Sequence, residues 1–96
     1  MGTFDDLQKN RKLISKMLKK ETDGEIVDFD FVVSHISFGK PIVTFLLAVP
    51  AVVKRDYRYN GGEDAILDKH METIRQVVSA AGFPEVFSRS VSYHVL

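Results

Sequence analysis

The hydrophobic pattern of the chain switches between the spacing of a helix and the spacing of a strand, and the order of these switches limits the possible folds. Helical spacing starts at Thr3 and continues for about 17 residues, with apolar side chains on one half and lysines on the other. A second helical stripe covers Glu63–Ala81, between the turn signal Asn60-Gly61-Gly62 and the stop signal of Gly82. Both segments are therefore predicted to be amphipathic helices, each with one face in the core.

Three other segments alternate apolar and polar residues with the period of two that is typical of strands. They are Glu25–Phe38, Ile42 to about Lys54, and Glu85–Leu96, so the predicted order of elements is α-β-β-α-β. Because a chain of this length holds one hydrophobic core, residues 1–96 are predicted to form a single domain. The predicted fold class is α+β, a two-layer sandwich with a three-stranded, mainly antiparallel sheet and two helices on one face.

Pro50 bears on the order of the strands, because proline cannot donate a hydrogen bond to a sheet ladder. If it marks an edge, a bulge or a bend in the second strand, the order is 2-1-3 and the sheet is fully antiparallel. If the apolar run of that strand instead makes it central, the order is 1-2-3 and the last pairing is parallel. Pro50 favours the first of these orders.

The pairing of the first two strands follows from the residues between them. Gly39-Lys40 is predicted to form a two-residue type II′ turn, which fixes the register and sets Phe31 opposite Ala48. In that register, the apolar residues of the second strand lie on the face that Phe29 and Phe31 do not use. The hairpin is thus predicted to be apolar on both faces.

Two helices can cover only one face of this sheet, so the other apolar face needs a partner. A patch of several hundred Å² is more than a monomer usually exposes, and a second copy of the chain is the commonest cover. An alternative is that the hairpin curls and buries both faces itself, or that the first helix covers one of them. The predicted dimer or partner surface consists of Ile36, Phe38, Val43, Phe45, Leu47 and Val49.

A second candidate surface lies in the segment Lys54–Gly62, where basic and aromatic residues are interleaved. Basic residues hold phosphates and aromatic rings stack on bases, so the segment suggests nucleic-acid binding, with the lysine face of the first helix as an extension. Two acidic residues, Glu63 and Asp64, follow directly and oppose this interpretation. The predicted nucleic-acid contacts are Lys12, Lys16, Arg55, Tyr57, Arg58 and Tyr59.

The titratable residues give no catalytic or metal-binding motif. The chain has no Cys, and His35, His70 and His94 lack the spacing that fixes two metal ligands on one helix. His70 lies in the apolar stripe of the second helix and is predicted to be buried and bonded to a backbone carbonyl. Asp28 and Asp30 project from one face of a strand and are predicted to be solvated edge charges. We therefore expect no cofactor, no metal and no enzymatic activity.

These patterns predict a small, non-enzymatic, regulatory protein that acts as a homodimer and presents a surface to a protein partner. Thirteen basic and thirteen acidic residues exclude a generally polycationic nucleic-acid coat protein, and a viral or mobile-element regulator fits the size. The longest nearly uncharged run is too short to span a bilayer, so we expect a cytoplasmic protein without a membrane partner. The alternative hypothesis is the nucleic-acid-binding module described above.

Overall fold

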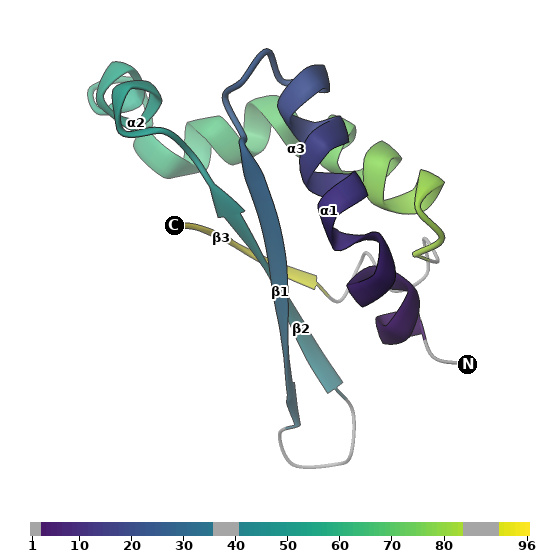
Figure 1. Ribbon diagram of the computed structural model, residues 1–96. Helices are drawn as coiled ribbons and strands as arrows, with labels where there is room; N and C mark the ends of the chain where they lie inside the picture. The colour runs from purple at the N-terminus through teal and green to yellow at the C-terminus, as the bar shows by residue number, and fades with distance from the viewer. Residues whose placement is uncertain (1–2, 36–40, 84–90) are drawn as a thin grey trace.

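The computed structural model describes residues 3–35, 41–83 and 91–96, and its elements follow the predicted order with one helix added. The elements are α1 (Thr3–Glu21), β1 (Asp28–His35), β2 (Pro41–Ala48), α2 (Ala51–Tyr57), α3 (Gly62–Ala80) and β3 (Val91–Val95). The two long helices lie together on one face of the three-stranded sheet, as Figure 1 shows. The predicted α+β fold class with two layers is confirmed.

The two long helices bury the apolar stripes that the sequence predicted. Ile14 of α1 and Ile74 of α3 are completely buried between the helices and the sheet. At the end of α1, Gly24 adopts a φ of 80° and its N–H donates to the carbonyl of Lys19 at 2.8 Å. This left-handed position ends the helix and returns the chain towards β1. The N–H group of the Asn10 side chain donates to the carbonyl that follows α3, at Ala81, and so ties the two helices together.

The strand order is β1-β2-β3, so the favoured order 2-1-3 is wrong and its alternative is correct. β2 pairs antiparallel with β1 and parallel with β3. The central position suits β2 because its alternate residues Val43, Phe45 and Leu47 are all buried. Pro50 lies beyond the end of the strand, and it therefore removes no hydrogen bond from the ladder.

The expectation that the return strand continues to Lys54 is also wrong, because the chain enters α2 at Ala51. Pro50 precedes the helix with a φ of −57°, and its carbonyl accepts from the N–H groups of Val53 and Lys54 at 3.0 and 3.1 Å. Proline is favourable at the start of a helix because its fixed φ is close to the helical value. Its missing N–H costs nothing there, since the first N–H groups of a helix have no partner within the helix. The proline thus marks the start of a helix, not an irregular strand.

The predicted hairpin register is wrong by three residues. Phe31 pairs with Phe45, not with Ala48. Because side chains alternate between the faces of a strand, a shift by an odd number turns every side chain of β2 to the other face. The apolar residues of β2 therefore share the helix-covered face with Phe29. The predicted turn at Gly39-Lys40 lies outside the described residues.

This shift overturns the predicted dimer or partner surface. Val43, Phe45, Leu47 and Val49 are buried within one copy of the chain, and Phe45 is only 1% exposed. Its ring packs edge to face on Phe29 at 5.0 Å between centroids, and on Phe83 at 5.6 Å. These residues form the centre of the core. Ile36 and Phe38, the other two members of the predicted surface, lie outside the described residues.

Candidate functional site

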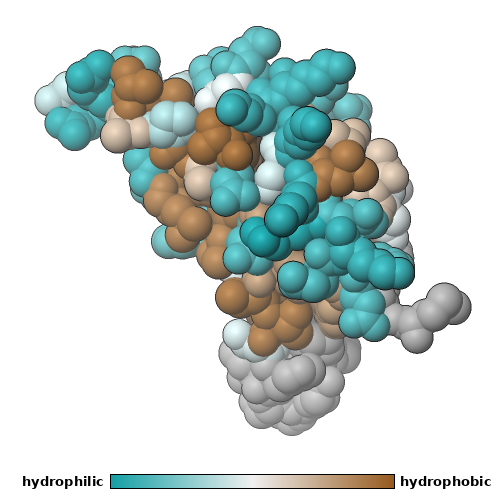
Figure 2. Space-filling model, in the orientation of Figure 1, coloured by the Kyte–Doolittle hydropathy of each residue, from teal (hydrophilic) through white to brown (hydrophobic). Residues whose placement is uncertain are grey.

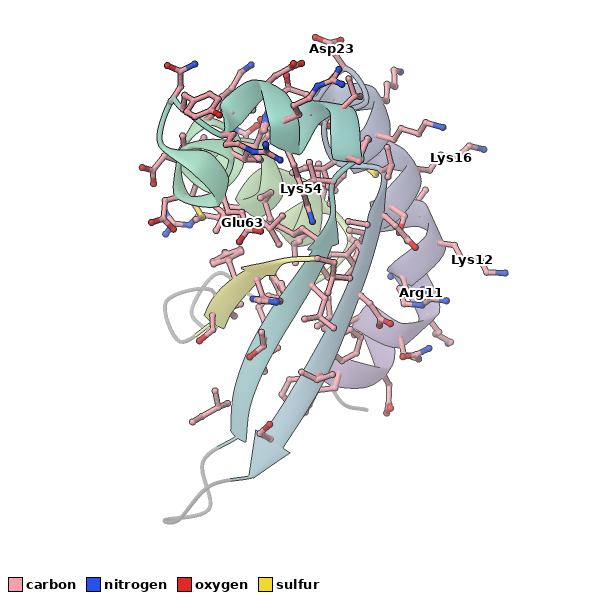
Figure 3. The ribbon with its side chains drawn as sticks, turned by 90° about the vertical axis from the view of Figure 1, so that its left-hand side faces the viewer. Arg11, Lys12, Lys16, Asp23, Lys54 and Glu63 are labelled. Atoms are coloured by element: carbon pink, nitrogen blue, oxygen red, sulfur yellow. The ribbon has the colours of Figure 1, made fainter. Side chains whose placement is uncertain are left out.

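The face of the sheet opposite α1 and α3 carries no helix, and we call it the open face. The strand pairing arranges its side chains in rows, of which the middle one runs from Asp30 through Leu46 to His94. The open face consists of Asp30, Val32, Ser34, Ile42, Thr44, Leu46, Ala48, Ser92 and His94. Figure 3 looks onto this face, with α2 above it.

The open face carries apolar side chains among polar ones: Val32 on β1, and Ile42 and Leu46 on β2 with Thr44 between them. Val32 is 47% exposed and Ile42 is 38% exposed, while Leu46 is half-buried between its neighbours. In Figure 2, apolar side chains reach the surface along the strands below α2, beside the hydrophilic side chains of α1. No aromatic ring of the described strands lies on this face, because Phe29, Phe31 and Tyr93 point towards the helices.

Two of the predicted nucleic-acid contacts meet at a hollow between α2 and the start of α3. This basic hollow has a volume of about 400 Å³, and its cationic wall is formed by Lys54, Arg55 and Arg58. In the described part of the chain, none of these three cations has a carboxylate within 4.0 Å. Glu63 also lines the hollow, so its charges add to about plus two.

The other predicted contacts are not brought to the same place. Lys12 and Lys16 project from the outer side of α1, away from Lys54 on α2 (Figure 3). Tyr57 is half-buried and its hydroxyl is already bonded within the protein, whereas Tyr59 is 88% exposed. The predicted set therefore divides into a hollow at α2 with one exposed ring, and a separate lysine surface on α1.

A polar cluster that sequence reasoning missed is centred on Glu25, in the connection between α1 and β1. The hydroxyl of Tyr57 donates to Glu25 Oε1 at 3.0 Å, and Nε2 of His70 donates to the same oxygen at 2.6 Å. The ammonium group of Lys69 lies 3.4 Å from this oxygen and 5.8 Å from the centre of the Tyr57 ring. One carboxylate thus joins α2 and α3 to the start of the sheet.

The environment of Glu25 favours its charged form. The hydrogen bond from His70 is the main cause that lowers the pKa of this carboxyl, with smaller contributions from Tyr57 and Lys69 that act against the effect of burial. The prediction that His70 is buried is confirmed, but its partner is this carboxylate and not a backbone carbonyl. Because the donors come from α2 and α3 and the acceptor from the connection before β1, we interpret the cluster as a link between elements.

Asp28 and Asp30 are both exposed on β1, an edge strand, as predicted. Asp28 Oδ1 lies 2.8 Å from the hydroxyl of Ser15, which joins α1 to the sheet. Within residues 3–35, 41–83 and 91–96, no group of three His, Asp or Glu side chains is placed to hold a metal ion. In the same ranges, no helix combines the length and the apolar character that crossing a membrane requires.

Comparison of the chain with protein-family models, with curated proteins and with solved structures found no match. What the protein does is therefore inferred from its own surfaces. The described residues offer an open face with exposed apolar side chains and a hollow with uncompensated basic charge. The first suits a protein partner, and the second suits an anion.

Proposed function

We propose that the protein is a non-enzymatic interaction protein that acts as a homodimer through the open face of its sheet. The observation that carries the proposal is the exposure of Val32 and Ile42, on the same face as the half-buried Leu46, where neither α1 nor α3 covers the sheet. Exposed apolar side chains interspersed with polar ones are typical of non-obligate protein–protein interfaces. The surface differs from the one predicted from the sequence, but the kind of partner is the same.

A second copy is the favoured occupant because the open face is complementary to itself. A twofold axis parallel to the strands and passing over β2 brings Leu46 onto Leu46 of the other copy, and Ile42 onto its counterpart. The same axis brings Asp30 opposite His94, because these residues flank Leu46 in one row. Ile42 and Leu46 then meet their counterparts on the axis with Thr44 between them, and Val32 faces Ser92 at the margin, in an isologous, aligned packing of two sheets.

The size of the open face indicates how strong this dimer is. β1 and β2 are eight residues each, so the face is about 26 Å long and about 14 Å wide at standard strand dimensions. Its projected area, roughly 350 Å² at those dimensions, is less than the roughly 800 Å² per partner of a standard stable interface. We therefore expect a weak dimer that dissociates on dilution through the micromolar range.

Substituting Ile42→Glu should weaken this dimer at least tenfold, because the two copies would then place like charges against each other on its twofold axis. Sedimentation velocity over a concentration series measures the effect. Leu13→Glu is the matched control, since Leu13 is 50% exposed on α1 and should leave the dimer unchanged. Equal dissociation constants for the two variants, or a natural chain that stays monomeric at high micromolar concentration, would contradict the proposal.

The pairing across the margin has its own test in a charge exchange. Asp30→Lys and His94→Glu should each weaken the dimer, because each brings like or uncompensated charges together. The double variant creates a pair of opposite charges and should recover most of the affinity. Additive losses in the double variant would show that Asp30 and His94 do not face each other.

A second candidate function is the binding of single-stranded nucleic acid at the basic hollow. Two observations favour this function. Three cations line the hollow, and none of them has a carboxylate partner in the described chain. The exposed ring of Tyr59 follows them closely in the sequence. Basic grooves beside exposed aromatic rings bind single strands through phosphate contacts and base stacking. The acidic side chain of Glu63 and the zero net charge make this the weaker candidate.

For this second function, Arg55→Gln with Arg58→Gln should weaken binding to a labelled oligothymidylate. Removing two phosphate contacts should also reduce the slope of the logarithm of the association constant against the logarithm of the salt concentration by about 1.4. Fluorescence anisotropy at several salt concentrations measures both quantities. The control is Lys12→Gln with Lys16→Gln, which removes the same charge from α1; an equal effect of the two pairs would assign binding to general charge and not to the hollow.

A further inference from the structure

The three cations of the basic hollow lie on one face of a helix and are open to a ligand. Arg58, the C-cap of α2, comes four residues after Lys54 and three after Arg55, and these spacings put the three side chains on the same face. Arg55 and Arg58 are exposed, and Lys54 is half-buried. The opposite side of the hollow is the start of α3, with Gly62 and the exposed Glu63.

The residue types in the hollow favour a phosphate group as its ligand. Each arginine presents a planar fork of donors that fits two oxygens, and a lysine adds a compact third charge. One arginine already matches both oxygens of a carboxylate, whereas a phosphate has further oxygens for a second arginine and a lysine. In residues 3–35, 41–83 and 91–96, the side chains of Lys54, Arg55 and Arg58 form no ion pair that would compete with such a ligand.

The net charge of the hollow distinguishes between two kinds of phosphate. The three cations and Glu63 add to about plus two. A phosphate inside a nucleic-acid strand is a diester and carries one negative charge. A phosphate at the end of a strand is a monoester and carries about −1.5 to −2 at neutral pH, as a phosphorylated side chain does. The terminal group therefore compensates the charge of the hollow, and an internal group leaves about half of it uncompensated.

We propose that the basic hollow binds the terminal phosphate of a single-stranded nucleic acid. This proposal rests on the second candidate function, which places a single strand at the same hollow. Arg55 and Arg58 hold the phosphate oxygens, and Lys54 supplies the third positive charge. Tyr59 directly follows Arg58 and is 88% exposed, so its ring is available to stack on a base near the end of the strand. The protein thus recognises the end of a strand and not its length.

Three oligothymidylates of equal length, each labelled at an internal base, test this proposal by fluorescence anisotropy. One has a 5′-phosphate, one has a 3′-phosphate, and the third has hydroxyl groups at both ends. At least one phosphorylated strand should bind at least tenfold more tightly than the unphosphorylated strand. Equal affinity for the three strands, with binding lost in the variant Arg55→Gln with Arg58→Gln, would overturn end recognition and support the second candidate function alone. No binding of any strand at millimolar concentration would contradict both.

Thymidine monophosphate distinguishes a strand end from a small phosphate ester. It carries the same terminal group, so it should displace the phosphorylated strand from the hollow. Its affinity should be at least tenfold lower than that of the strand, because it lacks the neighbouring nucleotides. A mononucleotide that binds as tightly as the phosphorylated strand would make a small phosphate ester the ligand and overturn the proposal.

The variant Glu63→Gln gives a test that a loss of folding cannot imitate, because binding should become stronger. Removing this carboxylate raises the charge of the hollow to about plus three, so the affinity for the phosphorylated strand should rise severalfold. Asp64→Asn is the matched control, since it removes the same charge from the next residue of α3, which lies outside the lining of the hollow. Equal gains in the two variants, or no gain in Glu63→Gln, would contradict a phosphate bound in the hollow.

Discussion

A Phe45→Ala chain is expected to lose about 3–5 kcal/mol of unfolding free energy, the range for truncating a large aromatic side chain in a core. Phe45 is 1% exposed at the centre of the sheet and contacts the rings of Phe29, Phe83 and Tyr93. Its removal leaves a cavity beneath both long helices. Because the free energy of unfolding of a small domain is only about 5–15 kcal/mol in total, the variant should be close to unfolded at physiological temperature.

Urea denaturation followed by circular dichroism measures this loss. Leu13→Ala is the control, because Leu13 is an apolar residue at 50% exposure and its truncation should cost less than about 1 kcal/mol. The result also decides between the predicted and the observed hairpin registers. If Phe45 lay on an outer dimer surface, the variant would dissociate the dimer and leave the folded monomer intact, which would contradict the observed packing.

A Glu25→Ala chain is expected to lose about 2–3 kcal/mol at neutral pH, because hydrogen bonds to a charged group are among the stronger ones. The substitution leaves the buried Nε2 of His70 and the hydroxyl of Tyr57 without their common acceptor. The side chain of His70 is 8% exposed, so water cannot fully replace the lost partner. Denaturation in urea at pH 7 gives the difference from the natural chain.

The effect of Glu25→Ala should depend on pH in a defined direction. The pKa of Glu25 is lowered from its ordinary value of 4.5, chiefly by the hydrogen bond from His70. A carboxyl whose pKa is lower in the folded state than in the unfolded state stabilises the folded protein. This stabilisation is complete above the pKa of the unfolded state, and it is lost as the pH falls through the pKa of the folded state. The difference between the two chains should therefore be full above pH 5 and shrink in more acidic solution. Glu21→Ala, at an exposed position of α1, is the control and should change the unfolding free energy little at any pH. If the loss of unfolding free energy in Glu25→Ala stayed constant down to pH 3, the charged form of Glu25 would not be what stabilises the cluster.

The long helices, and which side chains of the last strand face the core, were predictable because their signals are local. The stripe that includes Ile66, Ile74 and Val78 has the period of a helix and is buried as expected. In β3, Tyr93 points towards the helices and His94 towards solvent, as the alternation predicted. Such periodicities depend on neighbours a few residues apart, which the sequence displays directly.

The register of the hairpin was not predictable because β2 is apolar on both faces. Phe45 and Leu47 alternate with Leu46 and Ala48, so either face of the strand is an acceptable core face. The choice between them depends on which residues of β1 lie opposite, and this is a tertiary property. The prediction relied on the turn residues alone, and the resulting odd shift assigned the core of the protein to its surface.

The Glu25 cluster could not be found from the sequence for a different reason. Glu25 is separated from Tyr57 by 32 residues and from His70 by 45. No local spacing connects them, and they meet only because α2 and α3 return to the start of the sheet. The same limit applies to the pocket between α3 and β3, which brings Arg75 of a helix to Tyr93 of an edge strand.

Isotope-filtered NMR of a sample that mixes labelled and unlabelled copies tests the homodimer on the open face most directly. The expected result is a set of intermolecular contacts between the methyl groups of Ile42 and Leu46 in one copy and the same residues in the other. Val52 on α2 and Leu13 on α1 have similar exposure and should show none. Intermolecular contacts confined to Val52 or Leu13, or none at a millimolar concentration, would contradict the account.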